Sequence, residues 1–146
     1  MPGMNNLQIL IAEDDADDRY LIGTAFTEKG YSEKIDFVEN GVELLSYLEN
    51  ILVTNPDEKN LPCVILLDLN MPKKDGREAL KELKQHPTFK KIPVIVFTTT
   101  KNEIEIKRCY ELGANSYVVK PLTFDELLMV VENIRSYWFK TASIPA

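Results

Sequence analysis

The sequence predicts an α/β fold in which a doubly wound, five-stranded parallel sheet lies between two layers of helices. Three features indicate this fold: short apolar runs alternate with helical patterns, several runs are apolar at every position, and turn or capping signals separate the segments. A strand without alternating buried and exposed positions belongs in the middle of a parallel sheet that helices cover on both faces. Right-handed crossovers between parallel strands place the helices on those two faces.

The apolar runs of strand length come first in this interpretation. In chain order they are Leu7–Ala12, Lys34–Val38, Cys63–Leu67, Pro93–Thr98 and Ser116–Val119. The pattern of Lys34–Val38 is the weakest of the five. Five strands therefore alternate with five helices along the chain.

Helical patterns fill the intervals between these runs. The predicted helices are Asp17–Lys29, Val42–Glu49, Arg77–Gln85, Lys101–Leu112 and Phe124–Tyr137. Thr100 and Thr123 each have a glutamate three residues later, which is the spacing of a capping box and predicts that they cap the last two helices. Gly113 marks the end of the fourth helix.

Length and composition predict one domain. The chain has 146 residues, of which 45% are hydrophobic, enough for one substantial core. We expect an N-terminal extension over residues 1–6, the domain over 7–138 and a C-terminal tail over 139–146. The segment Ile51–Leu61 is polar around Asn55-Pro56-Asp57, which predicts an exposed loop.

Charge and cysteine usage narrow the function classes. The net charge of −6 provides no electrostatic footprint for direct nucleic-acid binding, so we expect a protein partner. The N-terminus lacks a basic segment followed by an apolar run, and no stretch approaches the roughly 18 apolar residues of a membrane span, so we expect a cytoplasmic protein. Cys63 and Cys109 lie far apart in apolar segments, which predicts buried free thiols.

Polar side chains follow four of the predicted strands at the point where each strand ends. They are Glu13-Asp14-Asp15 after the first strand, Asp68 and Asn70 after the third, Thr98-Thr99-Thr100 at the end of the fourth, and Lys120-Pro121 after the fifth. Ligands of an open parallel sheet bind at the carboxyl ends of its strands. We therefore expect acids, a hydroxyl and a lysine to converge on one edge of the sheet.

This group of residues suits a phosphoryl-transfer site. Carboxylates that lie close together repel one another, and a bound divalent cation offsets this repulsion. Ligands that are all oxygen atoms favour Mg²⁺. One carboxylate then remains to act, and Asp68, which follows four apolar residues, is the candidate nucleophile. The Lys120 ammonium would neutralise the oxygens of the transferring group, and Thr98 would hydrogen-bond one of them.

Other interpretations of the residues at the strand ends remain open. The acids of residues 13–18 could form only a solvated cluster that caps the N-terminus of the first helix, a role that we expect for Asp15. Lys120 could pair structurally with an acid. The site could also belong to an aspartate-nucleophile phosphohydrolase, although such enzymes usually carry a second acid two residues after the nucleophile, where this chain has Asn70.

The motifs together resemble the signature of response-regulator receiver domains of two-component systems. They are Glu13-Asp14, Leu67-Asp68-Leu69-Asn70-Met71-Pro72, Asp75-Gly76, Thr98 and Lys120-Pro121, and the match extends from about Leu7 to Ile134. The resemblance implies the flavodoxin-like, CheY-like form of the fold, with strand order 2-1-3-4-5. It also implies a signalling switch whose chemistry is limited to Mg²⁺-dependent self-phosphorylation and self-dephosphorylation. A degenerate receiver that binds partners without phosphorylation is the remaining alternative.

The resemblance also assigns roles to individual residues. It implies that Asp68 is the phosphoacceptor and that the Mg²⁺ site comprises Glu13, Asp14, Asp68 and the backbone carbonyl of Asn70, with Glu13 acting through metal-bound water. It implies that Thr98, Tyr117 and Lys120 form the switch and bind the phosphoryl group, and that Asn70 and Thr100 tune its loss. The peptide bond between Lys120 and Pro121 is expected to be cis.

A narrower resemblance, to the small regulators that partner bacterial phytochromes, concerns three segments. They are the long loop before Cys63, the run Pro72–Glu78, and the tail from Tyr137-Trp138-Phe139 to Ile144-Pro145. It implies phosphorylation by a sensor histidine kinase of bacteriophytochrome type, no output domain, and a homodimer formed through the fourth helix, fifth strand, fifth helix and tail.

The last predicted helix bears on that dimer. Its core-facing positions are Phe124, Leu127, Leu128, Val131, Ile134 and Trp138, while Val130, Ile134 and Tyr137 extend apolar character to a second side. A helix that is apolar on two sides often has a partner, but a wide core-facing stripe with incidental exposure explains the pattern as well.

Overall fold

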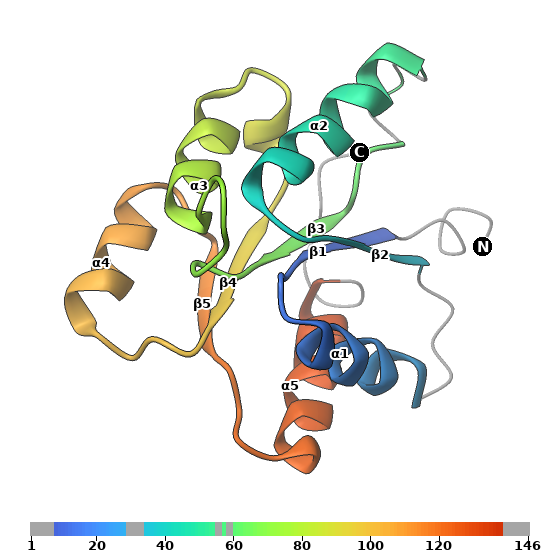
Figure 1. Ribbon diagram of the computed structural model, residues 1–146, viewed down its shortest axis with the longest axis vertical. Helices are drawn as coiled ribbons and strands as arrows, with labels where there is room; N and C mark the ends of the chain where they lie inside the picture. The colour runs from blue at the N-terminus through green and yellow to red at the C-terminus, as the bar shows by residue number, and fades with distance from the viewer. Residues whose placement is uncertain (1–7, 29–33, 55–56, 58–59, 139–146) are drawn as a thin grey trace.

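The computed structural model describes residues 8–28, 34–54, 57 and 60–138. Five parallel strands form one sheet in the order β2-β1-β3-β4-β5, which confirms the expected topology (Figure 1). The strands are β1 (Gln8–Ala12), β2 (Lys34–Val38), β3 (Val64–Leu67), β4 (Val94–Thr98) and β5 (Ser116–Val119). β3 and β4 begin one residue later than the sequence predicted.

The helices form two layers on opposite faces of the sheet. α1 (Ala16–Glu28) and α5 (Phe124–Ser136) cover one face, and α2 (Gly41–Thr54), α3 (Gly76–Gln85) and α4 (Glu103–Glu111) cover the other (Figure 1). A short 3-10 helix, η3 (Phe89–Lys91), follows α3 and was not predicted.

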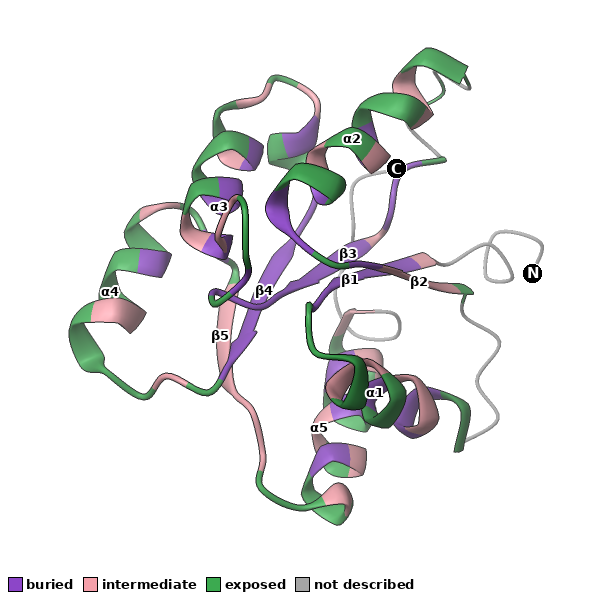
Figure 2. Ribbon diagram, in the orientation of Figure 1, coloured by how far each residue is buried: buried purple, intermediate pink, exposed green. Residues whose placement is uncertain are grey.

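The sheet separates two apolar clusters. Successive residues of β1 point to opposite faces, so Ile9 and Ile11 pack with α1 and α5, whereas Leu10 packs on the side of α2 and α3. Every residue of β3 and β4 is buried, and the outer strands β2 and β5 are more exposed (Figure 2). This confirms that the uniformly apolar runs are the inner strands of the sheet.

Two helix boundaries differ from the prediction by more than one residue. α2 continues to Thr54, because Ile51 and Leu52 pack against the core, so the predicted loop begins later than Ile51; part of it lies outside the described residues. α4 is capped by Asn102 and not by Thr100: the Asn102 side chain accepts hydrogen bonds from the backbone N–H groups of the first helical turn. The short asparagine side chain is a strong N-cap, which explains the shift of the helix start.

Of the predictions for α5, the capping residue is confirmed and the second apolar side is confirmed only in part. Thr123 caps α5 as predicted, accepting from the N–H of Glu126 at 3.2 Å. Of the three residues predicted to extend a second apolar side, Ile134 is buried, Val130 is half-buried against the core and Tyr137 is exposed; Met129 is exposed as well. The tail over 139–146 and the extension over 1–6 lie outside the described residues.

Two further predictions concern the cysteines and the absence of a membrane-spanning helix. Cys63 and Cys109 are free, as predicted, but of the two Cys109 is buried and Cys63, which directly precedes β3, is half-buried. Among the described helices, none has the length and apolar character needed to cross a membrane.

Candidate functional site

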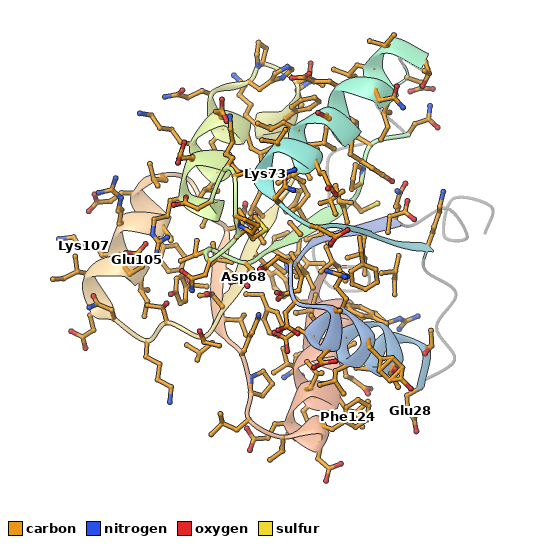
Figure 3. All side chains as sticks on the ribbon, viewed as in Figure 1. Glu28, Asp68, Lys73, Glu105, Lys107 and Phe124 are labelled. Carbon is orange, nitrogen blue, oxygen red and sulfur yellow. The ribbon has the colours of Figure 1, made fainter. Side chains whose placement is uncertain are left out.

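The backbone fixes the residues that follow the strands at one edge of the sheet. The N–H of Asp68 donates to the Ala12 carbonyl at 3.1 Å, which ties the end of β3 to the end of β1. In the same way, the N–H of Lys120 donates to the Thr98 carbonyl at 2.8 Å, next to the end of β4. Asp68 therefore lies directly after β3, near the middle of the molecule (Figure 3).

Three acids meet at this edge. Glu13, Asp14 and Asp68 each place one carboxylate oxygen within 4.8 Å of the others. Glu13 and Asp68 are buried, whereas Asp14 is exposed, so the cluster opens to solvent on one side. Such an all-oxygen set suits a hard divalent cation that keeps some of its waters. The sequence prediction that these acids converge is confirmed.

The surroundings of Glu13 raise its pKa. Burial is the main cause that raises the pKa of Glu13 to about 7, and the negative charge of Asp68 acts in the same direction, while the contact with Lys120 opposes it. A carboxylate with a raised pKa is one whose charge is incompletely compensated. The acid cluster can therefore accept more positive charge than Lys120 alone provides.

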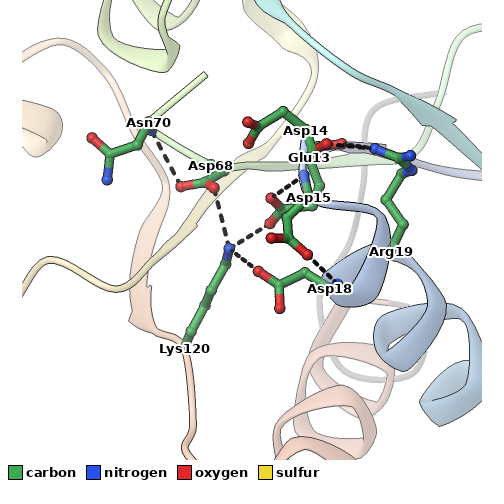
Figure 4. Close-up of polar contacts among 8 residues, drawn as sticks. All are labelled: Glu13, Asp14, Asp15, Asp18, Arg19, Asp68, Asn70 and Lys120. Atoms are coloured by element: carbon green, nitrogen blue, oxygen red, sulfur yellow. Dashed lines mark hydrogen bonds and ion pairs between the residues drawn. The ribbon is translucent and has the colours of Figure 1, made fainter. Parts of the chain in front are cut away.

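Lys120 connects the cluster. Its Nζ donates to Glu13 Oε1 at 2.5 Å, to Asp18 Oδ2 at 3.0 Å and to Asp68 Oδ2 at 3.1 Å (Figure 4). Burial alone would lower the pKa of Lys120, but the hydrogen bond to Glu13 and the charges of Asp68 and Glu13 raise it above its ordinary value. Lys120 is therefore cationic. It forms ion pairs with Glu13 and Asp18 and at the same time lies beside Asp68.

Thr98 presents an unusual hydroxyl. Its Oγ1 is buried and has no hydrogen-bond partner among the described residues. A buried hydroxyl without a partner costs about 1–3 kcal/mol, and Thr98 Oγ1 is free to donate to an acceptor placed beside it.

Tyr117 is tied to the loop that follows β4. Its hydroxyl donates to the Thr100 carbonyl at 2.8 Å, and its N–H donates to the Tyr110 hydroxyl at 3.0 Å. The ring is half-buried and packs against the cluster on the α2, α3 and α4 face. Tyr117 therefore lies on the strand next to the one that ends at Thr98, with Val96 as its register partner.

The loop from β3 to α3 packs tightly on Asp68. Gly76 lies so close that a Cβ atom on it would be 2.2 Å from the Asp68 carbonyl oxygen, and its N–H donates to the Leu69 carbonyl at 2.9 Å. The N–H of Asn70 donates to Asp68 Oδ1 at 3.3 Å, while its side chain is exposed. The loop thus holds the backbone of Asp68 and leaves the Asn70 amide facing solvent.

Two residues of α1 that the sequence analysis did not single out, Arg19 and Asp18, contact residues of the site. Arg19 Nη1 donates to the carbonyls of Glu13 at 3.0 Å and Asp14 at 2.9 Å, which holds the turn that carries both acids. Asp18 contacts Lys120, as described above. Asp15 acts as the helix cap that was predicted, since its Oδ1 accepts from the Asp18 N–H at 2.9 Å. The first turn of α1 gives no sequence signal for which acid will face the site.

One site prediction is wrong. The expected cis bond before Pro121 is absent, because the described residues contain no cis peptide bond. The trans form of an X-Pro bond is favoured by about 0.5–1 kcal/mol, so the local chain must impose the cis form for it to occur. In this structure the connection from Lys120 into α5 is made with the trans form.

The chain matches the family model for the response regulator receiver domain over residues 9–132. Among curated proteins it is similar to response regulator Rcp1 of Synechocystis, at 36% identity over 138 residues, which cover 94% of this chain and 92% of the relative.

Two solved structures extend the comparison. The phosphorylated cyanobacterial phytochrome response regulator RcpA superposes with a TM-score of 0.87 at 36% identity, covering 97% of this chain and 99% of that one. The Mn²⁺-bound form of Rcp1 gives 0.82 at 36% identity, covering 96% and 99%. With the acids of the site, these likenesses lead to one conclusion: the chain belongs to the response regulator receiver domain family.

Proposed function

We propose that the protein is a phosphorylation-dependent signalling switch that accepts a phosphoryl group on Asp68 from a sensor histidine kinase, with Mg²⁺ as the cofactor. The single observation that carries the proposal is the buried Asp68 carboxylate, which lies 3.1 Å from the Lys120 ammonium and within 4.8 Å of Glu13 and Asp14. Glu13, Asp14, Asp68 and the backbone carbonyl of Asn70 would hold the ion. When bound, Mg²⁺ supplies positive charge that offsets the charge of the phosphoryl oxygens.

The chemistry assigned to the chain's own residues is a phosphoryl transfer. A carboxylate oxygen of Asp68 attacks the phosphorus of a phosphohistidine; a P–O bond forms as the P–N bond breaks, and the histidine nitrogen leaves with the bonding electron pair. The Lys120 ammonium compensates negative charge on the phosphoryl oxygens. The product is an acyl phosphate on Asp68.

The switch would follow from the unpaired Thr98 hydroxyl. A phosphoryl group on Asp68 offers an acceptor to Oγ1, whose lack of a partner in the described structure is costly. Movement of Thr98 and its loop would weaken the hold of the Thr100 carbonyl on the Tyr117 hydroxyl and let Tyr117 turn inward. Phosphorylation would then shift a pre-existing equilibrium between two arrangements of α4 and β5.

The lifetime of the acyl phosphate is assigned to Asn70 and Thr100. The Asn70 side chain is exposed beside Asp68, and Thr100 is half-buried in the loop after β4. Both residues can influence how an attacking water is held, because one borders the phosphoacceptor and the other borders the switch.

The proposed partners are a phytochrome-type histidine kinase, an as yet undefined downstream protein and a second copy of the chain, all in the cytoplasm. The kinase type is supported by the likeness to phytochrome response regulators. Dimerisation through α4, β5, α5 and the tail is supported by the exposed apolar side chains Ile104 and Tyr110 on α4 and Met129 and Tyr137 at α5.

Beryllofluoride, a mimic of the phosphoryl group, tests the switch directly. With Mg²⁺ present we expect it to change the aromatic NMR signals of Tyr117 and to increase the dimer fraction in sedimentation velocity, and Asp68→Asn should remove both responses. A wild-type protein that binds Mg²⁺ but shows no response to beryllofluoride would contradict the proposal.

A further inference from the structure

A carboxylate from α1 reaches the proposed reaction centre without belonging to the acid cluster. Asp18 Oδ2 lies 3.0 Å from Lys120 Nζ, although the two residues are 102 positions apart. Glu13, Asp14 and Asp68 are the acids that come within 4.8 Å of one another, and Asp18 is outside that set. Its side chain is 39% exposed, whereas that of Lys120 is 11% exposed.

The donors of Lys120 explain why this contact matters. An ammonium group has three N–H donors, and the three acceptors at Lys120 are Glu13, Asp18 and Asp68. Two of these acceptors, Glu13 and Asp68, are committed to the cation and to the phosphoryl group in the proposed reaction. Asp18 is the acceptor that stays available to Lys120 throughout.

The surroundings give the lysine room to move. Asp18, Lys120, Pro121 and Leu122 line part of a pocket of about 90 Å³ beside the site. A lysine side chain has four rotatable bonds, and holding it in one rotamer costs conformational entropy. Asp18 borders the same pocket as Lys120, so its contact with Nζ restrains the ammonium on the side where the pocket leaves space.

Asp18 is itself well fixed. Its N–H donates to Asp15 Oδ1 at 2.9 Å at the start of α1, and α1 is held on the sheet by buried residues such as Ile22 and Phe26. The backbone that carries the Asp18 carboxylate is therefore held in place, which keeps the carboxylate within reach of Lys120.

We propose that Asp18 is a positioning residue for phosphoryl transfer: it holds the Lys120 ammonium toward Asp68 while Glu13 and Asp68 engage the cation and the phosphoryl group. This inference rests on the proposed function and deepens it. A preorganised cation accelerates a step in which negative charge must be compensated, because the group needs no reorganisation during the reaction.

The test is the rate of phosphorylation by acetyl phosphate at saturating Mg²⁺, followed by intact mass. We expect Asp18→Ala to lower the rate constant about three- to tenfold, the range for a charge-assisted contact that is partly screened by solvent. Asp18→Asn, which keeps an acceptor oxygen but not the charge, should fall between Asp18→Ala and wild type. Asp17→Ala is the matched control: Asp17 is exposed on the same helical turn and is not an acceptor of Lys120.

Two further readouts separate positioning from a merely structural role. The Mg²⁺ affinity of Asp18→Ala should stay within about twofold of wild type, because Asp18 is outside the acid cluster. In a Lys120→Ala background, Asp18→Ala should cause no further slowing, because residues that act as a unit are not additive.

The outcomes are distinct. A wild type that gains no phosphoryl group would overturn the proposed function and this inference with it. A wild type that is phosphorylated while Asp18→Ala matches Asp17→Ala, reacts faster than wild type, or slows equally in the Lys120→Ala background would overturn the inference alone.

Discussion

Lys120 Nζ donates a hydrogen bond to Asp68 Oδ2 at 3.1 Å, across 52 residues of sequence and from the end of one strand to the end of another. The same ammonium also contacts the buried Glu13 carboxylate and the more exposed Asp18 carboxylate, so a single cation balances several acids. Positive charge at this point is the condition on which the stability of the site and its proposed chemistry both depend.

Removing that charge should destabilise the protein in a way that Mg²⁺ relieves. In EDTA we expect Lys120→Met to lose about 2–4 kcal/mol of unfolding free energy, because it leaves Glu13 and Asp68 buried without their cation. Saturating Mg²⁺ should stabilise the variant more than it stabilises wild type. Urea unfolding with and without Mg²⁺ measures both effects, and Lys101→Met, an exposed position, is the control. Equal Mg²⁺ stabilisation of variant and wild type would contradict the account.

Gly76 should not tolerate a side chain. A methyl group there would lie 2.2 Å from the Asp68 carbonyl oxygen, so Gly76→Ala must displace the loop that carries the phosphoacceptor. We expect a loss of about 1–3 kcal/mol in chemical denaturation, together with slower phosphorylation by a small phosphodonor.

Gly23→Ala is the matched control for that substitution. Its added methyl group would meet Phe37 at 3.6 Å, an ordinary contact, and it lies inside α1. Replacement of a mid-helix glycine should raise stability by up to about 1 kcal/mol. If Gly76→Ala behaved like Gly23→Ala, the close approach to Asp68 would not be a constraint.

The hydroxyl of Thr98 should cost stability and serve the switch. Thr98→Val keeps the shape of the side chain and removes a buried Oγ1 that has no partner among the described residues. We therefore expect the free energy of unfolding to be unchanged or higher by up to about 1 kcal/mol. The same variant should lose the beryllofluoride response at Tyr117. A clear loss of stability in Thr98→Val would show that the hydroxyl already has a structural partner.

Tyr47 predicts a pH dependence at the opposite end of β1. Its hydroxyl donates to Asp36 Oδ2 at 2.5 Å; burial first, and then this carboxylate, raise the pKa of Tyr47 to about 12 from 10.0. A group whose pKa is raised by folding contributes stability that is complete below pH 10 and is lost as the pH rises toward 12.

The comparison of wild type with Tyr47→Phe isolates this contribution. We expect wild type to be more stable by about 1 kcal/mol below pH 10 and this advantage to fall steadily as the pH rises from 10 toward 12. The raised pKa of Lys120 affects both proteins equally, so its titration cancels in the difference. Urea denaturation across this range is the measurement, with Tyr20→Phe at an exposed position as the control. A difference that does not vary with pH would contradict the role of the Tyr47 hydroxyl.

The sequence predicted the sheet and the acid cluster because both follow from one rule, that inner parallel strands are uniformly apolar and deliver their following residues to a common edge. Glu13 and Asp68 come directly after inner strands and Lys120 directly after the edge strand β5, so their convergence needed no knowledge of helix orientation. The roles of Asp18 and Arg19 could not be predicted in the same way, because the rotation of α1 about its axis decides which acids of its first turn face Lys120.

Local competition explains the remaining errors. Thr100 and Asn102 are both good caps, and the structure uses the later one, which moves the start of α4. Val130 has the same apolar character as its neighbours, so only the packing of α5 on the sheet separates it from the exposed Met129. The bond before Pro121 was inferred from the family and not from any physical preference of this sequence.

The most direct test of the central claim is intact mass after incubation with acetyl phosphate, comparing wild type with Asp68→Asn in Mg²⁺ and in EDTA. We expect the gain of one phosphoryl group in wild type with Mg²⁺ only, and no gain in Asp68→Asn. Phosphorylation of Asp68→Asn to the same extent, or a folded wild type that gains nothing in Mg²⁺, would show that Asp68 is not the phosphoacceptor.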